Sequence, residues 1–234
     1  MHPENNAISP IYLVLTGIFI CCLMISNIVA GRLVDLYGFT LTADLFLFPI
    51  TYIFGDILTE VYGFRRARLA IWMGFGANLF MSAFFIFIVN LPHPDFFQDK
   101  AAYDLVLGFA PRVVVASLCA YFMGEFSNSV ILSWMKLKTR GRYLWTRTIG
   151  STLVGEGVDT CIFMTIAFAG IYSWPELLVM AQVQYFWKVA YEILATPLTY
   201  RLVGWIKHQE GVDVYDYDVA YNPFSLQLEE QPVA

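Results

Sequence analysis

Long apolar stretches recur along this chain of 234 residues, and they restrict its fold more than any other feature of the sequence. Six such stretches lie at residues 10–31, 43–62, 69–90, 110–134, 148–171 and 177–204. As a helix rising about 1.5 Å per residue, each is long enough to cross about 30 Å of hydrocarbon. Charged residues make up only 14% of the chain, roughly half the fraction found in soluble domains. The sequence therefore predicts an all-α integral membrane protein, a six-transmembrane-helix bundle forming one domain, followed by a tail at 205–234.

The connections between these stretches support the same division, because glycine, proline and charged residues collect there. Ser173, Pro175 and Glu176 have the pattern of a capping box with proline in the first turn, which predicts the start of the sixth helix. The tail contains EGVDVYDYD, whose acidic composition is typical of a solvated extension.

Lysine and arginine are distributed unequally between the two sides of the predicted bundle. If both termini share a side, ten basic residues flank the helices on that side and three on the other. The ten are Arg65, Arg66, Arg68, Lys136, Lys138, Arg140, Arg142, Arg147, Arg201 and Lys207, and the three are Arg32, Lys100 and Arg112. Because short cytoplasmic loops carry the excess of basic residues, both termini are predicted to be cytoplasmic.

Charged residues nevertheless lie inside the predicted spans, among them six acids and one base: Asp56, Glu60, Glu125, Glu156, Asp159, Lys188 and Glu192. Each costs on the order of 2.5–3.5 kcal/mol at the centre of a membrane helix, so most of them must face the interior of the bundle. Their spacing agrees, because four of the spans carry polar residues at positions i, i+4, i+7 or i+8, which fall on one face of a helix. We therefore expect a polar interior enclosed by apolar surfaces that face lipid.

Two interpretations of these polar residues stay open. Lys188 and Glu192 lie one turn apart and could simply neutralise each other. Asn78 and Ser82, in the third span, are typical of contacts between membrane helices. The excess of acids over bases then requires a ligand, bound protons, or an arginine that reaches into the bundle.

Membrane enzymes are disfavoured by what the spans contain. The three histidines, His2, His93 and His208, lie outside them, which argues against a Ser–His dyad or an H-E-x-x-H zinc site at membrane depth. Asp56 and Asp159 formally supply the two carboxylates of an aspartyl membrane protease, but no accompanying motif supports one. The sequence contains no G-x-x-x-x-G-K-[ST] loop, so ATP hydrolysis would need another subunit. We expect no catalytic residue, metal or cofactor.

Aromatic residues make up 17% of the chain, and several lie near the acids of the spans. Carboxylates and aromatic rings at one depth suit a flat, donor-rich molecule. A guanine-like ring offers adjacent N–H donors that one carboxylate accepts in a bidentate manner, while an amide or Lys188 donates to its carbonyl and an aromatic ring stacks on its face. These features permit a purine-like ligand without selecting it.

Five motifs, taken together and in order, resemble the queuosine precursor transporters, a family once grouped among vitamin-uptake proteins. They are SNIVAGRLVDLYGFTLTADLFLFPITYIFGDILTEVYGFRRAR, GEFSNS, GEGVDTCIF, KVAYEILATPLTY and VDVYDYDVAYNPFSL. The resemblance implies import of 7-cyano-7-deazaguanine, or of its aminomethyl relative, across the bacterial inner membrane for salvage into transfer-RNA queuosine. It also implies a bundle similar to the substrate-binding subunits of energy-coupling-factor transporters, without an obligatory ATPase.

The family motifs assign candidate site residues in this chain. We expect a ring-recognition site near mid-membrane whose amide contacts come from Asn27 and Asn128. Its other members are Glu125, Glu156, Asp159, Lys188, Tyr191 and Glu192. Asp56 and Glu60 are assigned to an inner gate, which either pairs with the arginines of residues 65–68 or exchanges protons. A static salt bridge that holds the end of the helix is the alternative.

The expected partners are a purine-like small molecule and the lipid bilayer, with no direct contact with nucleic acid and with a homodimer left open. The main alternative function is a membrane-embedded capture subunit of an ATP-driven, vitamin-type uptake complex. Such a subunit binds the substrate but cannot move it alone.

Overall fold

The computed structural model describes residues 9–30, 32–36, 39–94, 96–108, 111–217, 219 and 221–224. Its helices are α1 (Pro10–Val29), α2 (Phe48–Val89), α3 (Lys100–Leu107), α4 (Pro111–Thr139), α5 (Leu144–Phe168) and α6 (Trp174–Glu210). An antiparallel hairpin of β1 (Leu33–Leu36) and β2 (Phe39–Thr42), followed by the 3₁₀ helix η1 (Ala43–Phe46), connects α1 to α2. The predominance of helix agrees with the predicted all-α membrane class.

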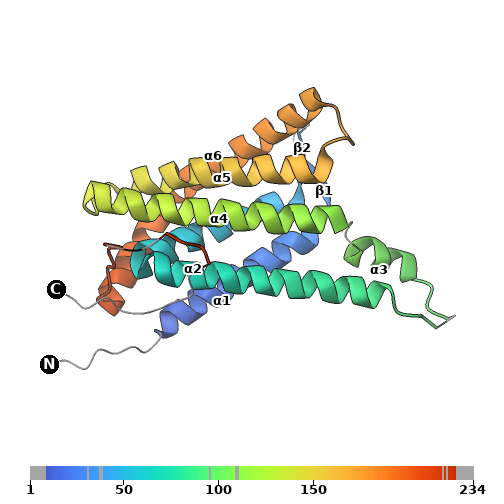
Figure 1. Ribbon diagram of the computed structural model, residues 1–234, viewed down its shortest axis with the longest axis horizontal. Helices are drawn as coiled ribbons and strands as arrows, with labels where there is room; N and C mark the ends of the chain where they lie inside the picture. The colour runs from blue at the N-terminus through green and yellow to red at the C-terminus, as the bar shows by residue number, and fades with distance from the viewer. Residues whose placement is uncertain are drawn as a thin grey trace.

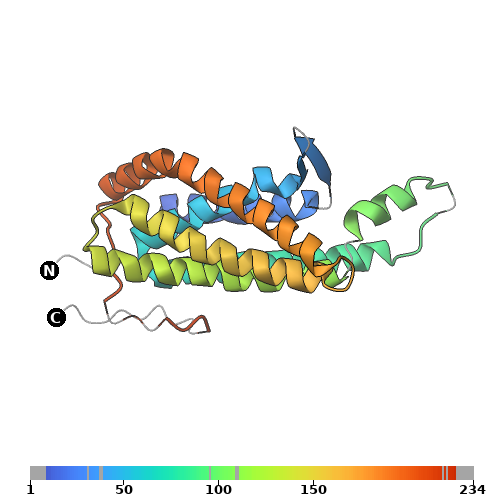
Figure 2. The same cartoon turned by 90° about the horizontal axis from the view of Figure 1, so that it is seen from above.

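The long helices run lengthwise through the bundle, and the two ends of the bundle differ (Figures 1 and 2). The β1–β2 hairpin and α3 lie at one end. The opposite end holds the start of α1 and the end of α6, where the Ser9 hydroxyl donates a hydrogen bond to the Glu210 carboxylate. The helical part of the chain therefore begins and ends on the same side, and we call this side the terminal end.

The helix α2 bends sharply at Gly63, where the sequence predicted a break between two spans. Gly63 has φ 81° and ψ 167°, a combination essentially restricted to glycine. Residues 48–62 and 64–89 consequently run in opposite directions along the bundle (Figure 1). The predicted loop between the second and third spans is thus reduced to a bend at the terminal end.

Four candidate spans among the described residues are long and apolar enough to cross a membrane: α1, α2, the segment Lys100–Thr139 that contains α3 and α4, and α5. The 37-residue helix α6 is not among them, because charged and polar residues interrupt its apolar run. Length and composition therefore identify four candidate spans, fewer than the six crossings predicted from the sequence. Six crossings require α6 and both halves of α2 to span the membrane separately.

The boundaries of α6 confirm one prediction and correct another. The helix begins at Trp174 behind a capping box formed by Ser173 and Glu176, as the sequence predicted. It continues to Glu210, so residues 205–210 are helical and do not belong to the tail. The eight-residue helix α3 lies between the predicted third and fourth spans, where no helix was expected.

The helices α4 and α5 approach each other closely because glycines face each other across their contact. A Cβ added to Gly124 would lie 3.2 Å from the carbonyl oxygen of Gly155, and one added to Gly155 would lie 3.1 Å from that of Gly124. Small residues allow such close approach between membrane helices. The crossing holds Glu125 beside Gly124 and Glu156 beside Gly155, so both acids are directed into the bundle at the same level.

Candidate functional site

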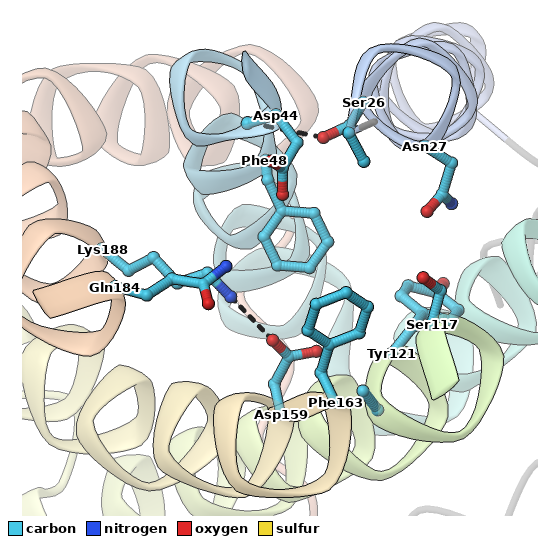
Figure 3. A pocket seen from close by; sticks show the side chains of 12 residues that line it. Ser26, Asn27, Asp44, Phe48, Ser117, Tyr121, Asp159, Phe163, Gln184 and Lys188 are labelled. Carbon is cyan, nitrogen blue, oxygen red and sulfur yellow. Dashed lines mark hydrogen bonds and ion pairs between the residues drawn. The ribbon is translucent and has the colours of Figure 1, made fainter. Parts of the chain in front are cut away.

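A polar pocket lies between five helices (Figure 3). It includes the end of α1 and the start of α2, so it lies toward the end of the bundle opposite the terminal end. Its side chains come from the last turns of α1, from η1 and the first turn of α2, and from α4, α5 and α6. The lining residues are Ser26, Asn27, Ala30, Asp44, Phe48, Ser117, Ala120, Tyr121, Asp159, Phe163, Gln184 and Lys188. The pocket therefore combines acidic, basic, amide and aromatic groups from segments far apart in the sequence.

Lys188 forms the centre of the charged wall of this pocket. Its Nζ lies 2.7 Å from Oδ2 of Asp159 and 2.8 Å from Oε2 of Glu156, and 4.3 Å from the centre of the Phe48 ring. Lys188 is only 2% exposed, so these contacts replace its hydration. The partners of Lys188 come from α5, so the pair with Glu192 that the sequence left open is not the arrangement found.

The other walls carry aromatic rings and polar atoms that lack partners. The rings of Phe48 and Phe163 both point into the pocket (Figure 3). Oε1 of Gln184 and Oδ1 of Asp44 are buried and have no hydrogen-bond partner among the described residues. On α1, the Asn27 side-chain amide donates a 2.7 Å hydrogen bond to Oδ1 of an asparagine in α2. The pocket thus presents free acceptors, one shared cation and two ring faces to the same space.

A second group of acids lies deeper in the bundle. We call Asp56, Glu125 and Glu192 the central acid cluster; all three side chains are at most 1% exposed. Asn128 donates a 2.7 Å hydrogen bond to Oδ1 of Asp56. The other oxygen of Asp56 and both carboxylate oxygens of Glu125 and Glu192 have no hydrogen-bond partner in the described part of the chain. Glu125 lies against Gly55, where a Cβ would come within 2.8 Å of its Oε2.

A third group, the ionic cluster, lies at the terminal end and consists of Glu60, Lys136, Arg147, Lys207 and Asp213. Arg147 binds both carboxylate oxygens of Glu60, each at 2.7 Å. Lys207 donates to Oε1 of Glu60 at 2.6 Å, and Nζ of Lys136 lies 3.6 Å from the same oxygen. Asp213 contacts both lysines; burial raises its pKa, but the hydrogen bonds from Lys136 and Lys207 dominate and hold the pKa below its usual value.

The partners of Glu60 differ from those expected. The sequence predicted the arginines of residues 65–68, which follow it closely in the chain. The structure instead brings Lys136, Arg147 and Lys207 to this carboxylate from α4, α5 and α6. Arg66 lies over the rings of two tyrosines, 5.9 and 6.0 Å from their centres, and Arg68 donates to a carbonyl of the C-terminal segment.

The C-terminal segment, residues 211–217, 219 and 221–224, is packed against the bundle and is not the solvated extension that its composition suggested. Asp216 is only 6% exposed, and its Oδ2 accepts hydrogen bonds from the backbone N–H of Phe64 at 2.9 Å and from the Ser133 hydroxyl at 2.6 Å. The indole N–H of Trp72 donates to the carbonyl of Pro223 at 2.7 Å. Asp216 therefore satisfies the backbone next to the bend in α2 and joins it to α4.

The three groups follow the same order along four helices. From the pocket to the terminal end, α2 carries Phe48, Asp56 and Glu60; α4 carries Tyr121, Glu125 and Lys136; and α6 carries Lys188, Glu192 and Lys207. The helix α5 carries Asp159 in the pocket and Arg147 in the ionic cluster, with Glu156, which contacts Lys188, between them. The central acid cluster therefore lies between the polar pocket and the ionic cluster. Asp56 and Glu60, only one turn apart, belong to different groups.

The predicted substrate residues divide between pocket and interior. Asn27, Asp159 and Lys188 line the pocket, and Glu156 reaches it through Lys188. Glu125, Asn128 and Glu192 lie behind it, and Tyr191 packs half-buried against the apolar core. Sequence reasoning missed Ser26, Asp44 and Phe48. Asp44 lies inside the predicted span 43–62, so the search for acids within spans that found the other carboxylates could also have found it.

Comparison with known proteins assigns this chain to a transporter family. Residues 42–202 match the family described as "Putative vitamin uptake transporter". The chain is 28% identical over 186 residues to the "Probable queuosine precursor transporter" of Bacillus subtilis (strain 168), covering 79% of this chain and 81% of that protein. It is 27% identical over 143 residues to the "Queuosine precursor transporter" of Escherichia coli (strain K12), covering 61% and 62% of the two chains.

No solved structure matches the chain. The family match spans most of α2, α4, α5 and α6, which carry most of the residues of the pocket and of the two clusters, and it confirms the resemblance identified from the motifs. The chain belongs to the putative vitamin uptake transporter family.

Proposed function

We propose that this protein imports a queuosine precursor, 7-cyano-7-deazaguanine or its aminomethyl relative, across the bacterial inner membrane, and that the polar pocket binds it. The observation that carries the proposal is the pairing of Lys188 with Asp159 beside the rings of Phe48 and Phe163 in the pocket. The names of the Bacillus subtilis and Escherichia coli relatives support this class of substrate.

The chemistry of the pocket matches the functional groups of a deazaguanine ring. The ring N–H and the neighbouring amino group form an adjacent donor pair, which the Asp159 carboxylate accepts at two oxygens. Lys188 then donates to the ring carbonyl, and Phe48 and Phe163 stack on the ring faces. Gln184, whose Oε1 lacks a partner in the described part of the chain, accepts from a remaining N–H of the substrate.

Binding in this way exchanges part of the Lys188–Asp159 pair for contacts with the substrate. Lys188 is not left unpaired, because it keeps its contact with Glu156, 2.8 Å away, and Asp159 accepts the two N–H bonds of the substrate in place of the bond from the lysine. An adenine-like ring carries an unprotonated nitrogen, not an N–H, beside its amino group, so it would leave one carboxylate oxygen without a donor, which costs about 1–3 kcal/mol for a buried group. This requirement is the basis for selecting guanine-like over adenine-like rings.

The proposed topology has six crossings, made by α1, the two halves of α2, α4, α5 and α6, with both termini cytoplasmic. The excess of lysine and arginine at the terminal end supports this orientation. The pocket then lies toward the outside and the ionic cluster toward the cytoplasm. The bonds among Glu60, Arg147 and Lys207 close the inner side, and alternating access requires that they open.

Transport by the chain alone, without a catalytic step, distinguishes this proposal from an ATP-driven capture subunit. The test is exchange of labelled 7-cyano-7-deazaguanine across proteoliposomes that contain only this protein and are loaded with unlabelled substrate. We expect exchange by the wild type and its loss in Lys188→Met, since the carbonyl donor is removed. The matched control is Lys138→Met, because Lys138 is exposed near the end of α4.

Two results would contradict the proposal. Exchange in Lys188→Met at the wild-type rate would remove the pocket as the binding site. Tight binding of the precursor without exchange, together with uptake when a partner ATPase is added, would establish the capture subunit instead.

A further inference from the structure

Buried acids outnumber buried bases in the described part of the chain. Seven acidic side chains are buried, namely Asp56, Glu60, Glu125, Glu156, Asp159, Glu192 and Asp216. The buried basic side chains are Arg68, Lys136, Arg147 and Lys188. The position of the excess negative charge follows from the acids that each cation contacts.

Each of these cations is engaged outside the central acid cluster. Lys188 contacts the two acids of α5. Lys136 and Arg147 contact Glu60 at the terminal end, and Arg68 donates to a carbonyl of the C-terminal segment. Asp216 accepts hydrogen bonds from a backbone N–H and a hydroxyl. The ion pairs of the described residues leave Asp56, Glu125 and Glu192 without a cation in contact.

The geometry around this cluster points to a small ligand that donates to oxygen. Five of its six carboxylate oxygens lack a hydrogen-bond partner among the described residues. Two neighbouring buried atoms, Oδ1 of Asn128 and Oη of Tyr52, also lack partners there. Tyr52 Oη lies 2.7 Å from the position of a Cβ on Gly124, directly beside Glu125. An isolated ionised carboxylate is strongly unfavourable in such surroundings, whereas a neutral carboxylic acid also supplies an O–H donor to its neighbours.

We propose that the central acid cluster binds the protons that drive transport, and that Glu125 is the principal proton carrier. This inference rests on the proposed function, because it assigns the energy source of that transport. The titratable groups around the cluster are Tyr52, Asp56 and Glu60 from α2, Tyr121 from α4, Glu156 and Asp159 from α5, and Lys188 and Glu192 from α6. Lys188 is the one base in this set, and it interacts electrostatically with Glu125.

The position of the cluster explains how a proton couples to substrate. Glu125 interacts electrostatically with Glu156, Asp159 and Lys188, so charge at Glu125 and contacts at the pocket influence each other. A proton from outside forms one O–H bond on Glu125 and converts the carboxylate to a neutral acid. The loaded protein then changes orientation without carrying this unpaired buried charge. On the cytoplasmic side the O–H bond breaks, the proton leaves, and the carboxylate returns.

The experiment compares two modes of transport in proteoliposomes containing the full chain. Exchange of labelled for unlabelled 7-cyano-7-deazaguanine needs binding and reorientation but no net proton movement. Accumulation driven by an inwardly directed pH gradient requires coupling. With one proton per substrate, a gradient of one pH unit supports up to about tenfold accumulation, since one pH unit corresponds to a factor of ten in proton activity.

We expect the wild type to show both modes and Glu125→Gln to keep exchange while its accumulation ratio falls to about one. Glu176→Gln is the matched control, because Glu176 is at the exposed start of α6 and glutamine preserves its capping box. Asp56→Asn provides a second variant of the cluster, for which a reduced accumulation ratio is expected. A pH-sensitive dye outside wild-type vesicles should report alkalinisation when substrate is added, a readout that does not depend on any variant folding.

The outcomes separate this inference from the function on which it rests. Absence of exchange in the wild type overturns the proposed substrate, and the coupling with it. Exchange without an effect of the pH gradient, or without alkalinisation, overturns proton coupling alone. Accumulation that follows a sodium gradient and not a pH gradient overturns the choice of proton. Wild-type accumulation by Glu125→Gln overturns the role of that residue.

Discussion

Replacing Glu60 by glutamine tests whether the ionic cluster holds the terminal end of the bundle together. Glu60 is fully buried and receives two bonds from Arg147 and one from Lys207, with Lys136 also 3.6 Å away. Glutamine has nearly the same shape but no charge. In Glu60→Gln the guanidinium of Arg147, 2% exposed, loses its carboxylate partner and keeps only neutral acceptors, the amide oxygen of the glutamine and the carbonyl of Arg142.

The expected loss follows from the burial of both partners. Removing one partner of a buried ion pair costs about 3–5 kcal/mol, because the remaining charge is left unpaired. Each 1 kcal/mol lowers Tm by roughly 2–4 °C in a chain of this size. Glu60→Gln should therefore lower Tm by about 6–20 °C. Glu60→Gln combined with Arg147→Gln should lose less than the two single changes together, since neither charge then remains.

The measurement is thermal unfolding in detergent micelles, monitored by the fluorescence of the six tryptophans. Arg201→Gln is the matched control for the arginine change, because Arg201 is exposed on α6; its Tm should stay within about 2 °C of the wild type. Additive losses of Tm in the double variant would refute the pairing. A fall in Tm of less than about 2 °C in Glu60→Gln would also refute it, since a pair that weak is typical of exposed residues, which contribute at most about 1 kcal/mol.

Two further changes probe the bend in α2. Gly63→Ala should lower Tm, because the backbone conformation at this position costs a non-glycine residue about 1–3 kcal/mol and the added Cβ would lie 2.7 Å from Val214. The control is Gly17→Ala, which should be neutral or stabilising because the space around its Cβ is open. An equal change in Tm for both variants would contradict the reasoning. Asp216→Ala should lower the free energy of unfolding by about 1–3 kcal/mol, because the buried N–H of Phe64 loses its acceptor. Denaturant titration in micelles measures this loss, and unchanged stability would mean that the C-terminal segment does not brace the bend.

Local features of the sequence predicted the helices well. Hydropathy placed a break between the second and third spans close to Gly63, and the capping box at Ser173 located the start of α6. Both signals depend on residues within a few positions of one another, so they can be interpreted without the tertiary structure. The polar faces of the helices were predictable for the same reason, because helical spacing determines which side chains share a face.

The partners of those polar residues were decided by tertiary structure alone. Asp56 and Glu60 are equivalent in the sequence, two acids one turn apart on one helix. In the fold, Glu60 meets cations from three other helices, whereas Asp56 meets the amide of Asn128 and other acids. The acidic C-terminal segment likewise resembles a solvated tail by composition and is packed through contacts with residues more than 80 positions away, including Ser133 and Phe64. Composition and periodicity determine which residues must be buried, but the charge of a buried site depends on which helices meet there.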